Sequence, residues 1–383
     1  MIRAGVGRAC ITPDLPVMLA GFGDRNEAAT EVHDDLEVRV LHLANVGTGA
    51  GDPPRAVCLV VCDLLGMSSN HAEPIRAAVA GALGLPHAAV LTASTHTHSG
   101  PSCIAGSEAV GWPCPEGYRE LLVTRCVQAA RQAEQSAVPS TLAYRRAPLP
   151  DGLSVNRRSL PYAPWLALLD VQDLSGTRVG TLANLAVHPV ALGPECRAVS
   201  ADWVHPFRRA AEAALGGTAI MLSGALGDVN PRHVHRQENA CPADGFAEAD
   251  ELGTELAQAV AAEVPGAQDF EGVVEIVRSE EFSAPVGGTL LSTLTATATM
   301  SVELIEWAIG EARLVSVPGE AFHAFGNALA AARPGPLLVA GLAPAWLGYL
   351  PVPFTEGYEE QMSMGRPFVD ALYGALIGRV TPS

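Results

Sequence analysis

Residues 88–101 read AAVLTASTHTHSGP, an apolar run that ends in a histidine pair. The run Ala88–Ala93 predicts a buried strand of an α/β fold, and polar residues follow it directly. In such folds, catalytic groups gather beyond the carboxyl ends of strands. If the backbone leaves strand geometry there, His96 and His98 both point into one cleft, where neutral imidazoles suit zinc. Taken alone, the same pattern is also typical of histidines packed in a core.

Buried strands alternate with amphipathic helices along most of the chain. Leu36–Ala44 alternates apolar and polar residues as a half-buried strand does, whereas Ala56–Cys62 is apolar throughout, as in a strand covered on both faces. Further strands are predicted at the amino terminus and at 165–171, 179–187, 218–223, 311–317 and 336–342. Helices are predicted at 71–84, 117–136, 205–215, 244–263, 321–333 and 367–378. The pattern indicates an α/β fold of mixed β-sheets flanked by helices.

The segment 271–308 departs from this alternation. It is rich in Val, Thr and Ser and contains a Gly-Gly turn, which predicts an antiparallel meander. No Pro/Gly-rich stretch is long and polar enough to be an interdomain linker. We therefore expect one domain over residues 1–383, with an antiparallel subregion at about 268–310. The loops at 100–116 and 345–366 are long enough to shape or cover a site.

Charge and cysteine content restrict the partners and the compartment. The formal net charge is −17 and every basic residue is an arginine, whereas nucleic acids and anionic membranes require a basic face. The eight cysteines form no CxxC pair, which favours reduced, mostly buried thiols over a disulfide framework. No signal segment and no membrane-spanning apolar run is present. We expect a soluble, cytoplasmic protein of bacterial type, and the sequence leaves the oligomeric state open, a homo-oligomer included.

Three more polar residues follow apolar strands. They are His188 after GTLANLAV, Glu320 after ARLVSV, and Tyr349 shortly after the strand 336–342. Each has a simpler interpretation as a core histidine, a helix cap or a half-buried tyrosine. Their repetition at strand ends favours a shared site.

Competing catalytic motifs are absent or weak. The sequence contains no GxSxG elbow, no phosphate-binding GxxxxGK[ST] loop and no HExxH helix. A second HxH, His233 and His235, is flanked by arginines, whose positive charge disfavours a bound cation. These observations argue against a serine hydrolase and against a second metal site.

Taken together, these segments resemble the catalytic domain of the neutral ceramidase family. The most specific match is THTHSGP at 95–101. Further matches run in order along nearly the whole chain: Gly5-Val6-Gly7-Arg8, Ile11-Thr12-Pro13, Gly21-Phe22-Gly23, His33-Asp34-Asp35-Leu36 with Arg39, Asn156-Arg157, Ser200-Ala201-Asp202, Gly227-Asp228-Val229-Asn230-Pro231 and Pro318-Gly319-Glu320.

The resemblance implies a site with one zinc ion per chain. By this resemblance, the four metal ligands are expected to be His96, His188, Glu320 and Tyr349. It also implies that His98 lies beside the metal-bound water, that Arg157 faces the substrate or product carboxylate, and that Tyr358 is a second active-site tyrosine.

The chemistry of these residue types agrees with this assignment. Zinc activates water for attack on a carbonyl carbon, and His98 can relay a proton to the leaving amine. Asp63, at the end of strand 56–62, is the best candidate for a carboxylate that orients a ligand imidazole, although it also suits a strand-end turn, and Asp202 and Asp228 carry the same ambiguity. We predict a zinc-dependent amidohydrolase that acts on linear amides. A zinc esterase or lactonase and an acyl-transfer enzyme remain alternatives, as does a non-catalytic binding protein.

Three departures from the family concern the substrate. Asn230 and Arg232 stand where true ceramidases tend to have serine and asparagine, the family's carboxy-terminal β-sandwich is not found, and no export signal is present. The loop 102–116 offers only Ile104, Val110 and Trp112 as apolar access surface. A small or medium N-acyl or peptide-like amide therefore fits at least as well as ceramide.

Overall fold

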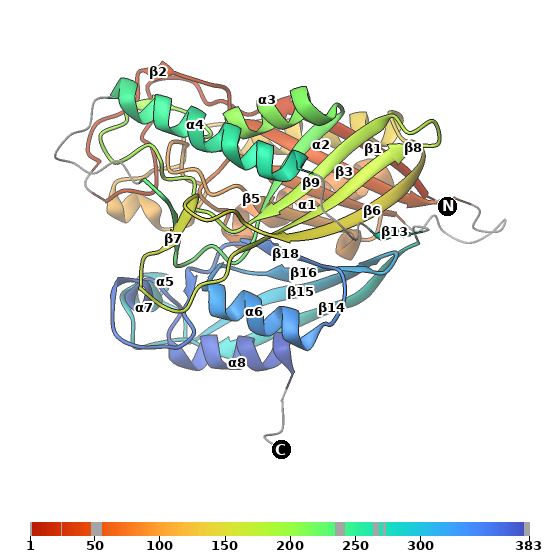
Figure 1. The fold of residues 1–383 in the computed structure, drawn as a ribbon. Coiled ribbons are helices and arrows are strands. Elements are labelled where there is room, and N and C mark those ends of the chain that lie inside the picture. The colour runs from red at the N-terminus through yellow and green to blue at the C-terminus, as the bar shows by residue number, and fades with distance from the viewer. Residues whose placement is uncertain are drawn as a thin grey trace.

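Two β-sheets pack face to face, and helices cover their outer faces (Figure 1). The structure is a computed structural model that describes residues 2–23, 25–46, 56–233, 242–262, 268–270 and 273–378. Three apolar clusters separate the four layers: one between helices and the large sheet, one between the sheets, and one between the small sheet and its helices. The predicted α/β class with mixed sheets and flanking helices is confirmed.

The large sheet combines parallel and antiparallel strands. Its strands, in spatial order, are β11 (Thr218–Ser223), β9 (Arg178–Leu185), β8 (Trp165–Asp173), β6 (Val138–Pro148), β1 (Ile2–Cys10), β3 (Glu37–Asn45), β4 (Ala56–Cys62) and β5 (Val90–Ser94), and β13 (Gln268–Phe270) pairs with β6. The pairs β11–β9 and β4–β5 are parallel. The strand β6 is not predicted from the sequence, because prolines near both its ends hide its strand character.

The side chains of β4 show how the sequence builds the layers. Val57, Leu59 and Val61 enter the cluster between the two sheets. Cys58 and Cys62 point the other way, into the cluster under the helices, and both are fully buried. The strand is therefore covered on both faces, as its continuous apolar sequence predicts, and these two cysteines belong to the core.

The small sheet contains the predicted antiparallel strands. Its order is β14 (Val274–Pro285), β15 (Thr299–Ile309), β16 (Ala312–Val317) and β18 (Leu337–Gly341). The first three pair antiparallel, and β18 joins β16 in parallel. The predicted meander omits a helix, α5 (Leu290–Thr295), between β14 and β15. This helix forms because Thr289 and Ser292 make a reciprocal capping box at its start.

The helices divide between the two outer faces. Those over the large sheet are α1 (Ser69–Leu83), α2 (Tyr118–Gln135), α3 (Val204–Leu215) and α4 (Pro242–Ala261). Those under the small sheet are α6 (His323–Ala332) and α8 (Arg366–Ile377) (Figure 1). The turns η1 (His87–Ala89) and η2 (Ser107–Val110) and the helix α7 (Tyr358–Gln361) are short. Among the helices of the described ranges, none is both long and apolar enough for a bilayer span.

The cysteines of the described residues are all free thiols. Five of them are buried, whereas Cys10 is exposed and Cys114 is partly exposed. Cys241 lies outside the described residues. The described thiols agree with the prediction of mostly buried, unpaired cysteines.

Three short strand pairs lie beyond the ends of the main strands. They are β17 (Glu320–Ala321) with β19 (Tyr349–Leu350), β7 (Ser154–Asn156) with β12 (Val229–Pro231), and β2 (Glu31–Val32) with β10 (Ala198–Val199). The carboxyl ends of β5 and β11, at opposite ends of the strand order, also meet. There, the Ser223 hydroxyl donates to the carbonyl oxygens of Ser94 and Thr95 at 2.9 and 3.1 Å.

Candidate active site

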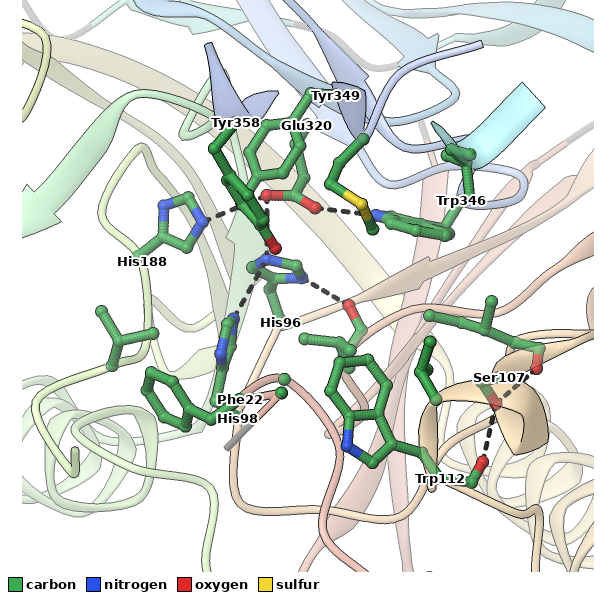
Figure 2. Close-up of a pocket in the computed structure, with 18 of the residues that line it drawn as sticks. Phe22, His96, His98, Ser107, Trp112, His188, Glu320, Trp346, Tyr349 and Tyr358 are labelled. Carbon is green, nitrogen blue, oxygen red and sulfur yellow. Dashed lines mark hydrogen bonds and ion pairs between the residues drawn. The ribbon is translucent and has the colours of Figure 1, made fainter. Parts of the chain in front are cut away.

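Residues that follow four different strands converge on one cavity (Figure 2). His96 follows β5, His188 follows β9, Glu320 follows β16 and Tyr349 follows β18. All four line a cavity of about 330 Å³. Because β17 and β19 pair in parallel, Glu320 and Tyr349 are also neighbours in register. The cavity thus combines residues from the ends of both sheets.

The backbone at His96 leaves strand geometry, as the sequence analysis required. Its φ is +76°, in the left-handed region that costs a non-glycine residue about 1–3 kcal/mol. Two hydrogen bonds hold this conformation: His96 N donates to Leu64 O and Thr95 N donates to Cys62 O, each at 2.9 Å. As a result, the Nε2 atoms of His96 and His98 lie 3.4 Å apart.

Three acceptor atoms face one another at the centre of the site. The Nε2 atoms of His96 and His188 each lie 3.2 Å from Oε2 of Glu320. The Nδ1 atoms of the two rings contact the carbonyl oxygens of Leu65 and Val229. Because a carbonyl oxygen only accepts, each Nδ1 carries the proton and each Nε2 presents a lone pair. Two lone pairs and a carboxylate oxygen around one point match the donor set of a bound cation, so these residues fit a metal ion.

Burial dominates the electrostatics of these groups. Burial lowers the pKa of His188 to about 4, which favours the neutral ring that a metal requires. Burial alone would raise the pKa of Glu320, but His96 and His188 hold it well below its usual value. Burial and the adjacent Glu320 raise the pKa of Tyr349. Glu320 is therefore the anion of the cluster.

Trp346 holds the carboxylate of Glu320 in place. Its indole Nε1 donates to Oε1 of Glu320 at 2.9 Å, which leaves Oε2 for the histidines. The sequence analysis missed this role. The signal available was the position of Trp346 three residues before Tyr349, on the segment that returns to β17.

His98 differs from the other two histidines. It is 9% exposed, and its Nδ1 is buried without a hydrogen-bond partner. Its ring packs on Phe22, with the ring centroids 4.9 Å apart. Gly21 lies so close that an added Cβ would be 2.4 Å from the imidazole. The ring is thus fixed by packing rather than by a carbonyl, and the lone Nδ1 leaves its tautomer free to change.

The other predicted residues of the cavity are also brought together. Arg157 lines it, and the guanidinium carbon lies 5.4 Å from the centre of the Tyr349 ring. Tyr358 lines it from α7, 6.0 Å from Tyr349 between ring centroids, and remains 63% exposed. Tyr358 therefore belongs to the rim of the cavity.

Asp63 is the exception, and the prediction that it orients a ligand imidazole is wrong. Its carboxylate is fully buried and accepts two hydrogen bonds from Arg208, at 3.0 and 2.7 Å. It also accepts bonds from the Thr95 hydroxyl and the Glu37 backbone N–H. A buried carboxylate gains most from a guanidinium, so it pairs with Arg208 instead of a histidine. Its link to the site is indirect, through the residue before His96.

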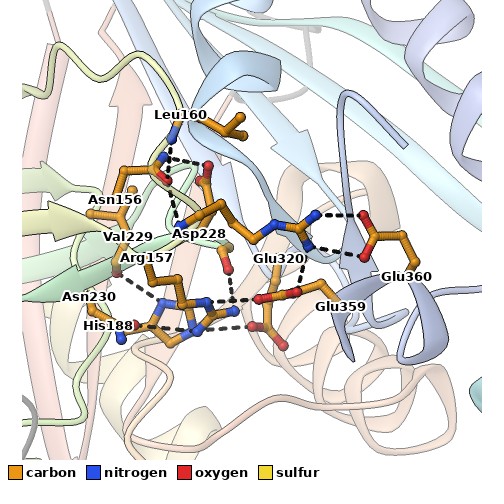
Figure 3. A network of polar contacts seen from close by, with 12 residues as sticks. Asn156, Arg157, Leu160, His188, Asp228, Val229, Asn230, Glu320, Glu359 and Glu360 are labelled. Atoms are coloured by element: carbon orange, nitrogen blue, oxygen red, sulfur yellow. Dashed lines mark hydrogen bonds and ion pairs between the residues drawn. The ribbon is translucent and has the colours of Figure 1, made fainter. Parts of the chain in front are cut away.

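The two ambiguous aspartates support the loops around the site. Asp202 accepts the backbone N–H groups of Ala191 and Leu192, just beyond His188. Asp228 accepts from the Asn156 side chain (Figure 3) and from the backbone N–H of His323. Of the discounted histidine pair, His233 is exposed, and His235 lies outside the described residues.

Comparison with known proteins assigns the fold. No family model matches the sequence, and no curated protein matches it. The neutral ceramidase from Pseudomonas aeruginosa superimposes with a TM-score of 0.80 over 98% of this chain and 73% of that chain, at 19% identity. A second structure, a ceramidase complexed with C2, gives a TM-score of 0.79 over 98% of this chain and 74% of that chain, at 17% identity. The chain has the neutral ceramidase fold.

Within this neutral ceramidase fold, one wall of the cavity is apolar. It includes Ile104, Val110 and Trp112 of the loop 102–116, as predicted. The helix α5 adds Leu291 and Leu294. The sequence analysis placed this apolar surface on the loop alone, because it interpreted 271–308 as strands without a helix. With these two leucines, the apolar wall can contact an apolar group of a ligand beside the histidines.

Proposed function

We propose that this protein is a zinc-dependent hydrolase that cleaves the amide bond of an N-acyl or peptide-like small molecule, with ceramide-like lipids among the candidates. The observation that carries the proposal is the convergence of two imidazole Nε2 atoms on Oε2 of Glu320 within a mostly apolar cavity. The fold supports it, since the two ceramidase structures named above share it.

The proposed metal ligands are His96, His188, Glu320 and Tyr349, with one zinc ion per chain. A zinc ion held there would supply a Lewis acid for the substrate carbonyl and an activated water for attack. The carbonyls behind His96 and His188 and the indole of Trp346 orient three of the ligands before any metal binds.

Three further residues act on the substrate in this proposal. His98 moves a proton to the leaving nitrogen, because its ring lies beside His96 and its Nδ1 is not committed to a partner. Arg157 and Tyr358 also line the cavity and offer hydrogen-bond donors to the oxygen atoms of the substrate. Proton transfer by His98 favours an amidase, since an amine leaves poorly without a proton and an alkoxide needs less help.

The lining of the cavity supports an acyl group as the apolar part of the substrate. Leu291, Leu294, Ile104 and Trp112 contribute apolar surface beside the histidines. The volume of about 330 Å³ lies near the lower end of ligand pockets. We therefore propose a substrate whose buried part is one acyl chain. The cytoplasmic compartment and the oligomeric state remain predictions.

The experiment that tests the metal site is elemental analysis of the purified protein. Wild type is expected to contain about one zinc per chain, and His96→Ala and Glu320→Ala to contain none. His87→Ala, at a surface histidine outside the cavity, is the matched control and should keep its zinc. Full zinc occupancy in both site variants would refute the ligand assignment.

A second experiment tests the reaction class. Wild type and His98→Ala are compared on an amide and an ester that share one acyl group. We expect His98→Ala to lose about 100-fold or more on the amide and much less on the ester. Equal losses on both substrates would favour the esterase alternative.

A further inference from the structure

Two consecutive arginines, Arg157 and Arg158, form ion pairs with two consecutive glutamates, Glu359 and Glu360, beside the cavity. Figure 3 shows Arg157 and both glutamates in this network. Nε of Arg157 donates to Oε1 of Glu359 at 2.9 Å, and Arg158 donates to Oε2 of the same carboxylate at 2.7 Å. Arg158 also reaches both oxygens of Glu360, at 3.0 and 3.2 Å. Glu359 is therefore shared by both arginines, whereas Glu360 contacts only Arg158 of the two.

Both carboxylates are shielded from solvent. Glu359 is 7% exposed and Glu360 is 2% exposed. Thr355 completes the shell of Glu360, because its backbone N–H and its hydroxyl both donate to Oε1. Charges that are withdrawn from water in this way act on their neighbours with little screening.

Arg157 is the member of this cluster that lines the cavity. Besides Glu359, it donates to the carbonyl of Gly227 at 2.7 Å and to the side chain of Asn230 at 3.3 Å. These bonds use three of the five N–H groups that a guanidinium carries. The guanidinium also bonds the Tyr349 side chain, and the N–H that remains can bind a ligand beside the negative charge of Glu359.

We propose that Glu359 is a specificity-determining residue, an inference that rests on the proposed function. A ligand carboxylate at Arg157 would lie close to the carboxylate of Glu359, so their repulsion offsets its attraction to the guanidinium. A neutral hydroxyl or amide keeps its hydrogen bond without that repulsion. The site thus selects substrates that are uncharged at the end that contacts Arg157. It disfavours substrates that differ from these only by a carboxylate at that end.

The test uses the zinc-loaded protein with two ligands that share an acyl group, N-octanoylethanolamine and N-octanoylglycine. We compare kcat/KM for N-octanoylglycine with kcat/KM for N-octanoylethanolamine. Glu359→Gln is expected to raise the ratio of the first to the second about tenfold or more, because one negative charge near the ligand is removed. Glu359→Ala removes the same charge without placing an amide N–H against Arg158 and should shift the ratio in the same direction. Glu359→Asp keeps the charge and should keep the wild-type ratio.

Glu360→Gln is the matched control, since Glu360 belongs to the same cluster but does not contact Arg157. It should leave the ratio within about twofold of wild type, whatever it does to stability. An unchanged ratio in folded Glu359→Gln and Glu359→Ala, or an equal shift in Glu360→Gln, would overturn the inference.

Calorimetric binding of both ligands separates this inference from the proposed function. If wild type hydrolyses neither ligand, the proposed function fails, and the binding ratio still decides the role of Glu359. The inference then stands if the Glu359 variants bind N-octanoylglycine about tenfold better relative to N-octanoylethanolamine, and it falls if they do not.

Discussion

The packing of Gly21 against His98 allows the role of this histidine to be tested without changing the histidine itself. An alanine Cβ at position 21 would lie 2.4 Å from Cγ and Nδ1 of the His98 ring and 2.8 Å from its Cβ. The φ of Gly21 is +108°, a region that alanine avoids. Gly21→Ala must therefore displace the imidazole, the loop or both.

The size of the effect follows from this geometry. Relief of a 2.4 Å contact to the usual 3.4 Å or more requires a shift of about 1 Å, and a misplacement of that size can cost about 100-fold in rate. None of the closest contacts of the added Cβ is to His96, His188 or Glu320. We expect Gly21→Ala to lose about 100-fold in kcat on an amide substrate while it retains its zinc.

Gly23→Ala is the matched control, because an added Cβ there meets no atom within 4 Å. Steady-state kinetics and elemental analysis are compared for wild type and both variants. Wild-type kcat in Gly21→Ala would refute the proposed role of His98. Loss of zinc in Gly21→Ala would show that the displacement reaches the metal ligands, against the reasoning above.

Three further predictions concern the residues around the site and the core. Trp346→Phe removes the donor to Oε1 of Glu320 and is expected to weaken zinc affinity about 10–100-fold, measured by competition with a chelator. Asp63→Asn leaves the buried Arg208 without its carboxylate and is expected to lower the free energy of unfolding by about 3–5 kcal/mol in urea denaturation at pH 7. Burial lowers the pKa of His42 from 6.5 to about 4, so over that range the unfolded chain binds a proton that the folded protein does not. Stability therefore falls as the pH drops from 6.5 to about 4, and His42→Leu should remove about 3 kcal/mol of that loss, measured by urea denaturation at pH 7 and pH 4.

Each of these expectations has a contrary outcome. Equal chelator resistance of Trp346→Phe and wild type would show that the indole does not support the metal site. A change below about 1 kcal/mol in Asp63→Asn would mean that water or another group replaces the carboxylate. If His42→Leu and wild type lose the same free energy of unfolding between pH 7 and pH 4, groups other than His42 cause the acid sensitivity.

The chemistry-bearing residues could be identified from the sequence because their signal is local. Ala88–Ala93, Gly180–Val187 and Ala312–Val317 are apolar runs that His96, His188 and Glu320 follow within three residues, and the structure brings these three side chains together. A strand end is readable from hydrophobicity alone, since the apolar run must stop where the sheet stops.

Errors arose where the outcome depended on a distant partner. From the sequence, either a histidine or an arginine could pair with the carboxylate of Asp63. Only the packing decides that Arg208 of α3 reaches it. Likewise, the Thr- and Ser-rich segment around α5 has strand-like composition, but the capping box of Thr289 and Ser292 makes a helix there.

The sequence by itself therefore determined the α/β class, the order of most strands and helices, and most of the polar residues that line the cavity. Only the tertiary structure decided that the residues after β5 and β9, strands far apart in the strand order, meet at one site. It also decided that Trp346, Gly21 and Glu359 position Glu320, His98 and Arg157. The physical reason is that hydrophobic periodicity is a local property of the sequence, whereas a hydrogen bond such as that between Arg157 and Glu359, more than 200 residues apart, depends on how the layers pack.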